Sequence, residues 1–214
     1  MQKKAPDHRL ILASNSPRRK QLLENVGLVF GVIPSHVDEQ QIEMTVPQRL
    51  VKTLATAKAK EVSRAHPKSW VIGADTIVVI DDRVLGKPSS VEDAREMIQR
   101  LNGQSHDVFT GYAICCEKEK HCTCEVERTE VFFKQISESE IEWYLQTEEP
   151  YDKAGAYAIQ EIGSFLVKRI HGSYTNVVGL PVCEIIDYLF QLGVIAPDSG
   201  NKWCTCAWPT DPEP

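Results

Sequence analysis

The sequence predicts a mixed α/β fold, with helices packed on a β-sheet that contains both parallel and antiparallel strands. Short apolar, β-branched runs alternate with segments of helical periodicity, which favours βαβ units. Residues 108–135 depart from this alternation, because they read as consecutive strands around a charged turn at 117–121, long enough for a lobe of their own. A doubly wound dinucleotide fold is disfavoured, since no G-x-G-x-x-G follows the first strand and no G-x-x-x-x-G-K-[ST] occurs.

Length and charge limit the classes of function. The chain has 214 residues, which suits one large domain or two small lobes. A net charge of −6 disfavours binding to a nucleic acid polymer, whereas a small anionic substrate needs only a few local cations. No run approaches the roughly 18 to 20 apolar residues that span a bilayer, and the N-terminus lacks the apolar core of a secretory signal. We therefore expect no membrane partner and no nucleic acid partner.

The first strand, residues 9–13, leads directly into a helix. Ser16 is a good N-cap, Pro17 suits the first helical position, and Gly27 closes the helix. Arg18 and Arg19 stand in the first turn, where positive charge opposes the helix dipole. An anionic ligand at the helix N-terminus would explain both arginines, and a solvated basic turn is the alternative.

A long helix follows a second strand at 29–33 and a turn-rich segment at 34–40. We expect Thr45 to open this helix, with Gln48 in the capping-box position. Its apolar stripe is expected to run through Leu50, Leu54 and Ala57 toward Glu61. Lys58 lies beside that stripe, so its side chain either snorkels to solvent or points into a cleft.

The run at 71–80 combines β-branched residues, which favour a buried strand, with an acidic residue at its middle. A carboxylate in such a run needs a cation, a hydrogen-bond network or a solvent cleft, because burying it alone is costly. Gly73 removes a side chain just before Asp75, so another group can approach the backbone. The alternative is that Asp75 caps a turn between two edge strands.

The rest of the chain continues the α/β pattern. Residues 151–160 fit neither a helix nor a strand, and their small side chains permit close approach to a ligand. We expect an N-terminal tail at 1–8, one domain at 9–196 and a flexible tail at 197–214. The other expected elements are a strand at 83–85 broken at 86–88, a helix from Ser90 to Gly103, strands at 108–116 and 122–135, a helix capped by Ser137 and Glu140, a strand at 165–170, a polar loop at 171–179 and a helix from Pro181 to Gly193.

Seven cysteines, an odd number that includes adjacent Cys115 and Cys116, favour reduced thiols over a disulfide framework. A soft-metal site is a second possibility. Its spacing is C-x-C rather than the C-x-x-C of common zinc sites. Its candidate ligands are His121, Cys122, Cys124, Cys204 and Cys206.

Polar residues that a stable fold would not require cluster at strand ends and helix starts, where open α/β sheets place ligands. Four are cations and two are carboxylates, a mixture that suits a polyphosphate held with a divalent metal. No histidine or cysteine forms a nucleophile–base pair, so direct attack by water is favoured. These residues are Ser14, Ser16, Arg18, Arg19, Glu39, Lys58, Asp75, Lys87 and Gln160.

Eight short motifs between Leu10 and Leu192 together resemble the Maf family of nucleoside triphosphate pyrophosphatases. Each motif is weak alone, but all eight occur in order at workable spacings. One departure is Ala158, where many relatives have glycine, and its extra methyl group would tighten the pocket. The motifs are ASNSPRR at 13–19, VDE at 37–39, AKAKEV at 57–62, GADTIV at 73–78, GKP at 86–88, FTG at 109–111, DKAGAYAIQ at 152–160 and NVVGLP at 176–181.

The resemblance implies a cytoplasmic enzyme, weakly a homodimer, that cleaves a nucleotide between its α- and β-phosphates with Mg²⁺ or Mn²⁺. It also implies an elongated mixed sheet with a central cleft between two lobes, like that of inosine triphosphate pyrophosphatases. Asp75 would be the proton acceptor, Glu39 and Lys58 would assist catalysis, and Asp75 and Glu39 would bind the metal. Ser14, Ser16, Arg19 and Lys87 would bind the substrate, with the cations stabilising the leaving diphosphate.

Arg18, Thr76 and Gln160 match the type of that family that prefers dTTP and UTP, with modified pyrimidine nucleotides as relatives. The neutral amide of Gln160 can both donate and accept, as a uracil or thymine edge requires. A sister type that prefers 7-methyl-GTP has SPWR, GSDQ and a glutamate at these places. That type and a non-catalytic nucleotide-sensing regulator of cell division are the alternatives.

Overall fold

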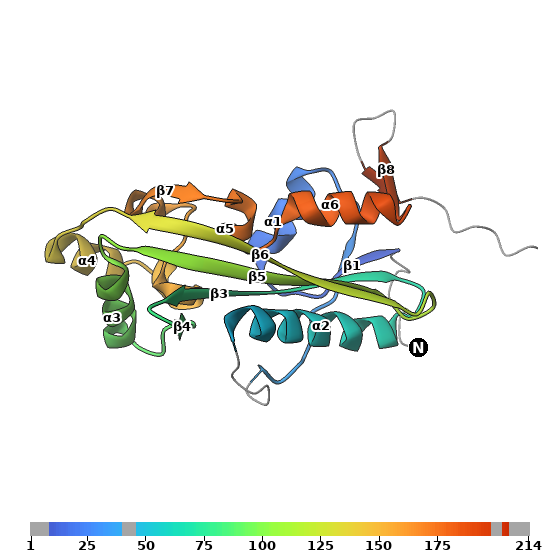
Figure 1. Cartoon of the computed structure of the whole chain (residues 1–214), viewed down its shortest axis with the longest axis horizontal. Coiled ribbons are helices and arrows are strands. Elements are labelled where there is room, and N and C mark those ends of the chain that lie inside the picture. Colours follow the sequence, from blue (N-terminus) through green and yellow to red (C-terminus); the bar gives the residue numbers. More distant parts are fainter. Residues whose placement is uncertain (1–8, 40–45, 198–202, 206–214) are drawn as a thin grey trace, which may run out of the picture.

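A computed structural model describes residues 9–39, 46–197 and 203–205 and confirms the mixed α/β fold. A seven-stranded sheet has the order β2-β1-β3-β5-β6-β7, with β4 also paired to β3 (Figure 1). β1 is parallel to both β2 and β3, and the other pairs are antiparallel. The strands are β1 (Leu10–Leu12), β2 (Gly31–Val32), β3 (Trp70–Ile80), β4 (Arg83–Leu85), β5 (Ser105–Cys116), β6 (His121–Phe133) and β7 (Val167–His171).

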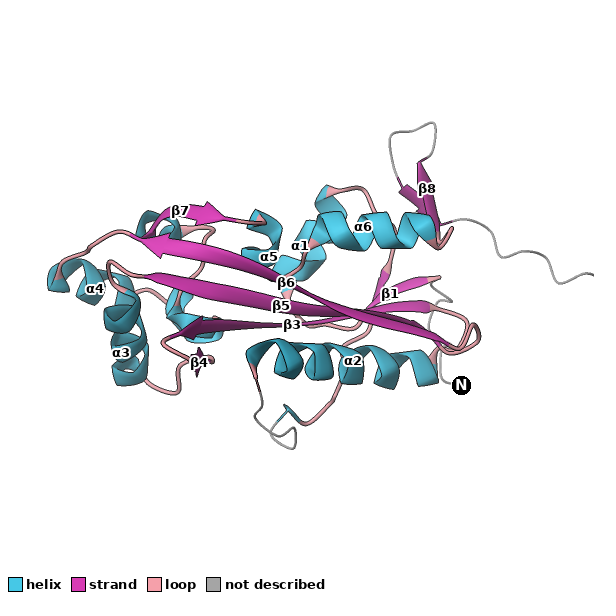
Figure 2. Ribbon diagram, viewed as in Figure 1, coloured by secondary structure: helices cyan, strands magenta, loops and turns pink. Residues whose placement is uncertain are grey.

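Helices cover both faces of this sheet. Figure 2 shows the longest helix, α2, along one face, with α1, α5 and α6 on the other and α3 and α4 at one end. No helix in the described ranges has both the length and the apolarity that a membrane span needs. The α-helices are α1 (Pro17–Asn25), α2 (Pro47–Ala65), α3 (Val91–Leu101), α4 (Glu138–Leu145), α5 (Tyr174–Val178) and α6 (Val182–Gln191), and the 3₁₀ turns are η2 (Glu149–Asp152), η3 (Ala154–Ala156) and η4 (Ile162–Leu166).

Serine caps begin several helices, as the sequence predicts. The Ser16 hydroxyl accepts from the Arg19 N–H, the Ser90 hydroxyl caps α3, and Ser137 forms a complete capping box with Glu140. The capping box expected for α2 is wrong. This helix begins at Pro47 after Val46 and has no side-chain cap, and Thr45 lies outside the described residues.

β3 is one continuous central strand, so the interpretation of Asp75 as a turn cap between edge strands is wrong. It is paired with β5 from Val71 to Val79, which also makes the β5–β6 hairpin part of the main sheet and not a separate lobe. Alternate side chains of a strand point to opposite faces. Asp75 therefore faces α2, and Thr76 faces the side that carries α1.

Two strand glycines seat α2 directly on the sheet. A Cβ at Gly73 would lie 2.4 Å from the Ala55 carbonyl oxygen, and one at Gly111 would lie 2.4 Å from that of Val51. The buried face of α2 is rotated from the expected stripe. Leu50 and Leu54 are buried as expected, but Ala57 and Glu61 are only half-buried. The residues of α2 that are buried are Leu50, Val51, Leu54, Ala55, Ala59, Val62 and Ser63.

The sheet has a gap beside the middle of β3. β5 occupies one edge of β3, so β1 and β4 must both pair with the opposite edge. β1 ends its pairing at Ile72, and β4 begins at Val78. Among the described residues, residues 73–77 thus have a strand on one edge only. Asp75 lies at the centre of this open edge.

Separate hydrophobic clusters lie on the two sides of the gap. One contains Leu12, Leu23 and Ile185, and the other contains Ile98, Val131, Tyr144 and further residues of α3 and α4. This arrangement agrees with the expected elongated sheet and with two lobes around a central cleft.

Smaller differences from expectation occur near the C-terminus. The predicted polar loop at 171–179 contains α5, and β7 begins at Val167 because η4 occupies the preceding residues. β9 (Trp203–Thr205) pairs with β8 (Ile195–Pro197), so the expected tail boundary at 196/197 does not hold for these residues. Residues 1–8, 198–202 and 206–214 lie outside the described part.

We predict that Gly73→Ala lowers the free energy of unfolding by about 1–3 kcal/mol, because the new methyl group would overlap the backbone of α2, which cannot rotate away. Urea denaturation measures the change. Gly86→Ala is the matched control, since a Cβ there meets nothing within 4 Å. Equal unfolding midpoints for the two variants would contradict the tight seating of α2.

Candidate active site

Asp75, Lys58 and Glu39 form a line of alternating charge at the open edge of β3. The Lys58 ammonium nitrogen lies 2.7 Å from Oδ1 of Asp75 and 2.7 Å from Oε1 of Glu39. The side chains of Asp75 and Lys58 are each only 12% exposed, so neither charge would be tolerated there without its partner. Glu39 is more than half exposed at the rim. α2 thus supplies the cation that the buried acid requires.

Arg19 joins three segments around the same edge. Its Nε donates to the Gly179 carbonyl at 2.8 Å, and its Nη1 donates to the Ala74 carbonyl at 2.9 Å. Nη1 also reaches the Ser14 hydroxyl at 3.3 Å, and Nη2 reaches the Thr76 hydroxyl at 3.1 Å. Four of the five N–H groups of the guanidinium are therefore used within the protein. Burial lowers the pKa of Arg19, while the nearby charge of Asp75 acts to raise it.

These hydrogen bonds give Arg19 and Thr76 structural roles that the sequence did not predict. Arg19 binds the edge of β3 that a neighbouring strand would otherwise cover, and one of its N–H groups remains for a substrate. The Thr76 hydroxyl contacts Arg19 and lies 2.9 Å from the Thr110 hydroxyl. Thr76 therefore positions the arginine, whatever it contributes to specificity.

Two adjoining cavities open at this edge. The larger has a volume of about 450 Å³ and includes Asp75, Thr76 and Gln160 in its wall. The smaller, of about 320 Å³, includes Ser14 and the start of α1. Every site residue predicted from the sequence lines at least one of them. The walls of both contain Ser16, Arg18, Arg19, Glu39, Lys58, Lys87 and Asp152.

The two cavities differ in chemistry. The larger has an apolar inner wall with the Gln160 amide as a neutral polar group, and that wall includes Val78, Val108, Tyr157 and Val177. The smaller is bounded by hydroxyls and by cations, among them Lys87 on the loop after β4. One ligand with an apolar ring and an anionic tail would match both cavities together.

Sequence reasoning did not assign Asp152 and Lys153 to the site. Asp152 Oδ2 accepts from Arg18 Nη1 at 3.1 Å, and the Lys153 ammonium contacts the other oxygen of that carboxylate. Partial burial opposes the charged form of Asp152, but the hydrogen bonds from Lys153 and Arg18 outweigh it and lower the pKa of Asp152. Both residues belong to the DKAGAYAIQ motif, which was the available signal.

Hydrogen bonds to the buried Glu149 carboxylate and to Tyr157 hold the segment that carries Lys153 and Gln160. The buried carboxylate of Glu149 accepts from the N–H groups of Ile162 and Gly163 at 2.9 and 2.7 Å, and from the Tyr144 hydroxyl at 3.1 Å. His106 Nε2 lies 2.7 Å from the Tyr157 hydroxyl, in the wall of the larger cavity. These contacts hold the loop without using any cation of the cavity.

The carboxylates of Asp75 and Glu39 fit a divalent metal. They already converge on one cation, the Lys58 ammonium, and a Mg²⁺ ion is commonly held by one or two carboxylates together with substrate phosphates. Within the described ranges, no group of three or more His, Cys, Asp or Glu side chains is arranged to hold a metal. A metal at Asp75 and Glu39 would therefore need oxygen ligands from the substrate or from water.

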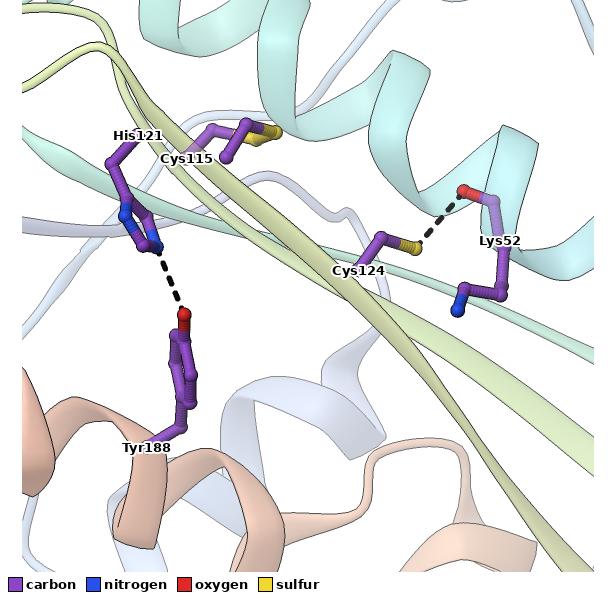
Figure 3. The surroundings of a disulfide bond; sticks show 6 residues. Lys52, Cys115, His121, Cys124 and Tyr188 are labelled. Carbon is purple, nitrogen blue, oxygen red and sulfur yellow. Dashed lines mark hydrogen bonds between the residues drawn. A yellow bond between two sulfur atoms is a disulfide. The ribbon is translucent and has the colours of Figure 1, made fainter.

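The alternative cysteine site does not assemble in the described part. Cys122 forms a disulfide with Cys115, its cross-strand neighbour, so the expectation of reduced thiols is wrong for this pair. Figure 3 shows the Cys124 thiol donating a hydrogen bond to the Lys52 carbonyl, and a hydrogen bond between His121 and the Tyr188 hydroxyl. Cys204 is a free thiol, and Cys206 lies outside the described residues.

Comparisons with known proteins match most of the chain. The family described as Maf-like protein matches residues 9–192. A dTTP/UTP pyrophosphatase of Syntrophus aciditrophicus (strain SB) is 47% identical over 185 residues, 86% of this chain and 90% of that protein. Another protein of that name, from Geobacillus sp. (strain WCH70), is 50% identical over 184 residues, 86% and 98% of the two chains. A solved HAM1 protein from Coxiella burnetii aligns with 58% of this chain and 72% of its own, at 12% identity and a TM-score of 0.40.

We predict that stability falls as pH drops below about 6.5, partly because of His106. Burial lowers the pKa of His106 to about 3. Between about pH 6.5 and 3, His106 is therefore protonated in the unfolded chain but neutral in the folded protein. The free energy of unfolding falls by up to about 1.4 kcal/mol for each pH unit by which the pH drops within that window.

Denaturation of wild type and His106→Gln between pH 7.5 and 5 measures this slope, which the variant should reduce. Tyr157→Phe is the control, because it keeps the imidazole buried and should keep the slope. Equal slopes for wild type and His106→Gln would show that His106 does not contribute.

Proposed function

Since the chain belongs to the Maf-like protein family, we propose that it is a nucleoside triphosphate pyrophosphatase that hydrolyses dTTP and UTP to the monophosphate and diphosphate. The observation that carries the proposal is the Asp75–Lys58–Glu39 group beside two adjoining cavities that share their cations, of which only the larger also has an apolar inner wall. The relatives named dTTP/UTP pyrophosphatase support the choice of substrate.

The substrate spans the two cavities. Its base and sugar occupy the larger cavity, against the apolar wall and Gln160. Its phosphates extend into the smaller one, past Ser14, Ser16 and Lys87. The bond between the α- and β-phosphates then lies where the cavities meet, beside Asp75 and Lys58. Holding both ends of the substrate in this way fixes the reacting phosphorus relative to the acid.

Asp75 is the proton acceptor. A water oxygen adds to the α-phosphorus, the bond from that phosphorus to the α–β bridging oxygen breaks, and diphosphate leaves. The proton that the water loses passes to Oδ2 of Asp75, because Lys58 holds Oδ1. Lys58, Lys87 and Arg18 stabilise the charge that builds on the departing diphosphate, and this stabilisation is largest in the transition state.

A divalent metal, Mg²⁺ or Mn²⁺, would be held by Asp75 and Glu39. When bound, it would supply Lewis-acid polarisation of the phosphate oxygens and lower the pKa of a bound water. Lys58 then balances the remaining negative charge of the two carboxylates.

Gln160 and its neighbours read the base. Its amide can donate to a carbonyl and accept from the imide N–H, so it can pair with the edge of uracil or thymine. Ala158, in the same wall, contributes a methyl group that narrows the space available to the base.

The proposed function is tested by incubating the protein with a nucleotide panel and Mg²⁺ or Mn²⁺, and by identifying the products. Release of diphosphate, not orthophosphate, from dTTP and UTP is expected. The panel includes 7-methyl-GTP and modified pyrimidine nucleotides. Preference for 7-methyl-GTP would indicate the sister type, and tight binding without hydrolysis would indicate a sensor.

We predict that Asp75→Asn lowers kcat by about 10²–10⁴-fold, because the amide cannot accept the proton. Single-turnover assays of UTP cleavage measure the loss, and the thermal midpoint verifies the fold. Lys60→Met is the control, since Lys60 lies on the exposed side of the same helix, away from the two cavities. Near wild-type turnover of Asp75→Asn would exclude Asp75 as the base.

We predict that Gln160→Glu lowers kcat/KM for UTP about tenfold or more, because a carboxylate opposite a uracil carbonyl leaves two acceptors facing each other. Activity toward GTP should fall less. The ratio of the two kcat/KM values is the readout, and an unchanged ratio would remove Gln160 from base recognition.

A further inference from the structure

Two cations converge on one exposed carboxylate where the two cavities meet. Asp152 receives Arg18 from α1 and Lys153 from its own segment. Arg18 and Asp152 are 134 residues apart in the sequence, and both line both cavities. Because the Asp152 side chain is also 60% exposed, we take this ion pair as the entrance to the two cavities.

The geometry points to Asp152 as an internal competitor for substrate phosphate, and to Lys153 as a further substrate-binding cation. This inference rests on the proposed function and adds a means of product release to it. In the free enzyme, the Asp152 carboxylate occupies an anion position that a phosphate would take in the complex. The three residues Arg18, Asp152 and Lys153 are named the entrance triad below.

The two sides of the entrance triad differ in how firmly they are held. The Asp152 side chain is 60% exposed, and exposed ion pairs contribute little stability, so a phosphate can replace it as the partner of Arg18. Arg18 can then bind two phosphate oxygens at once through its planar guanidinium. The Lys153 side chain is only 11% exposed, and its ammonium also donates to the Glu149 carbonyl at 3.2 Å. Lys153 is thus fixed in place, with a third N–H for a ligand.

Lys153 acts near the nucleoside end of the substrate. It lines the larger cavity together with Gln160 but not the smaller cationic one. A cation in that place contacts the α-phosphate, which remains on the monophosphate after cleavage. Once diphosphate has left, Asp152 competes with the monophosphate for Arg18 and Lys153 and so favours its release.

The competition predicts that removing the Asp152 charge strengthens the binding of the monophosphate product. Asp152→Asn removes the competing charge, so affinity for dTMP and UMP should rise about fivefold, which corresponds to one exposed ion pair. Lys153→Met should lower that affinity by at least as much. In the double variant, the gain from Asp152→Asn should shrink, because one of the two released cations is missing. Asp152→Glu keeps the charge and should restore wild-type affinity.

Calorimetric titration of each folded variant with dTMP, with UMP and with inorganic diphosphate measures these affinities, and the inhibition constant of UMP during UTP hydrolysis provides a second readout. The control is Asp107→Asn, which breaks a comparable ion pair with Arg128 at 2.9 Å outside both cavities and should leave monophosphate affinity unchanged.

A purely structural role of Asp152 would give the opposite result, because loss of the carboxylate would loosen the loop and weaken binding. Unchanged or weaker monophosphate binding by Asp152→Asn therefore overturns the inference. If wild-type protein hydrolyses UTP but Asp152→Asn binds the monophosphate no more tightly than wild type, only the inference fails. If wild-type protein neither hydrolyses dTTP and UTP nor binds their monophosphates, the proposed function fails first.

Discussion

The rest of the structure depends on the open edge of β3 between β1 and β4. An unpaired strand edge leaves backbone groups to be satisfied, and this one also carries a carboxylate that is almost buried. Arg19 satisfies the backbone at Ala74, and Lys58 balances the charge of Asp75. The two cations come from helices on opposite faces of the sheet. The opening can therefore persist as a cleft, since its polar groups are paired without a covering strand.

Fixed and exchangeable contacts are separated within this cleft. α2 rests on Gly73 and Gly111 with no intervening side chain, which fixes Lys58 relative to Asp75. Arg19 is fixed by four hydrogen bonds. Exposed charges at the entrance, such as Asp152, pair weakly and can change partners. A hydrolase needs both properties, because the reacting bond must be held in one orientation while substrate and product pass the entrance.

Much of the candidate site follows from residue chemistry in the sequence. An acid within a β-branched run predicted a buried carboxylate in need of a cation, and the structure provides Lys58 at 2.7 Å. Arg19 lines both cavities, but most of its hydrogen bonds support the protein, which only the paths of β3 and the 176–181 segment reveal. Asp152 and Lys153 gave no separate signal, because an acid beside a lysine is ordinary in a surface turn.

The sequence by itself determined the local structure: the serine caps of α1, α3 and α4 and the strand that contains Asp75. These features depend on residues within a few positions of one another, whose propensities and hydrogen bonds are local. Only the tertiary structure decided which edge of β3 stays open, how α2 is rotated, and which cations reach Asp75 and Asp152. Those outcomes depend on pairings between segments up to 160 residues apart. Long-range packing selects among such pairings, and no short window of sequence encodes that choice.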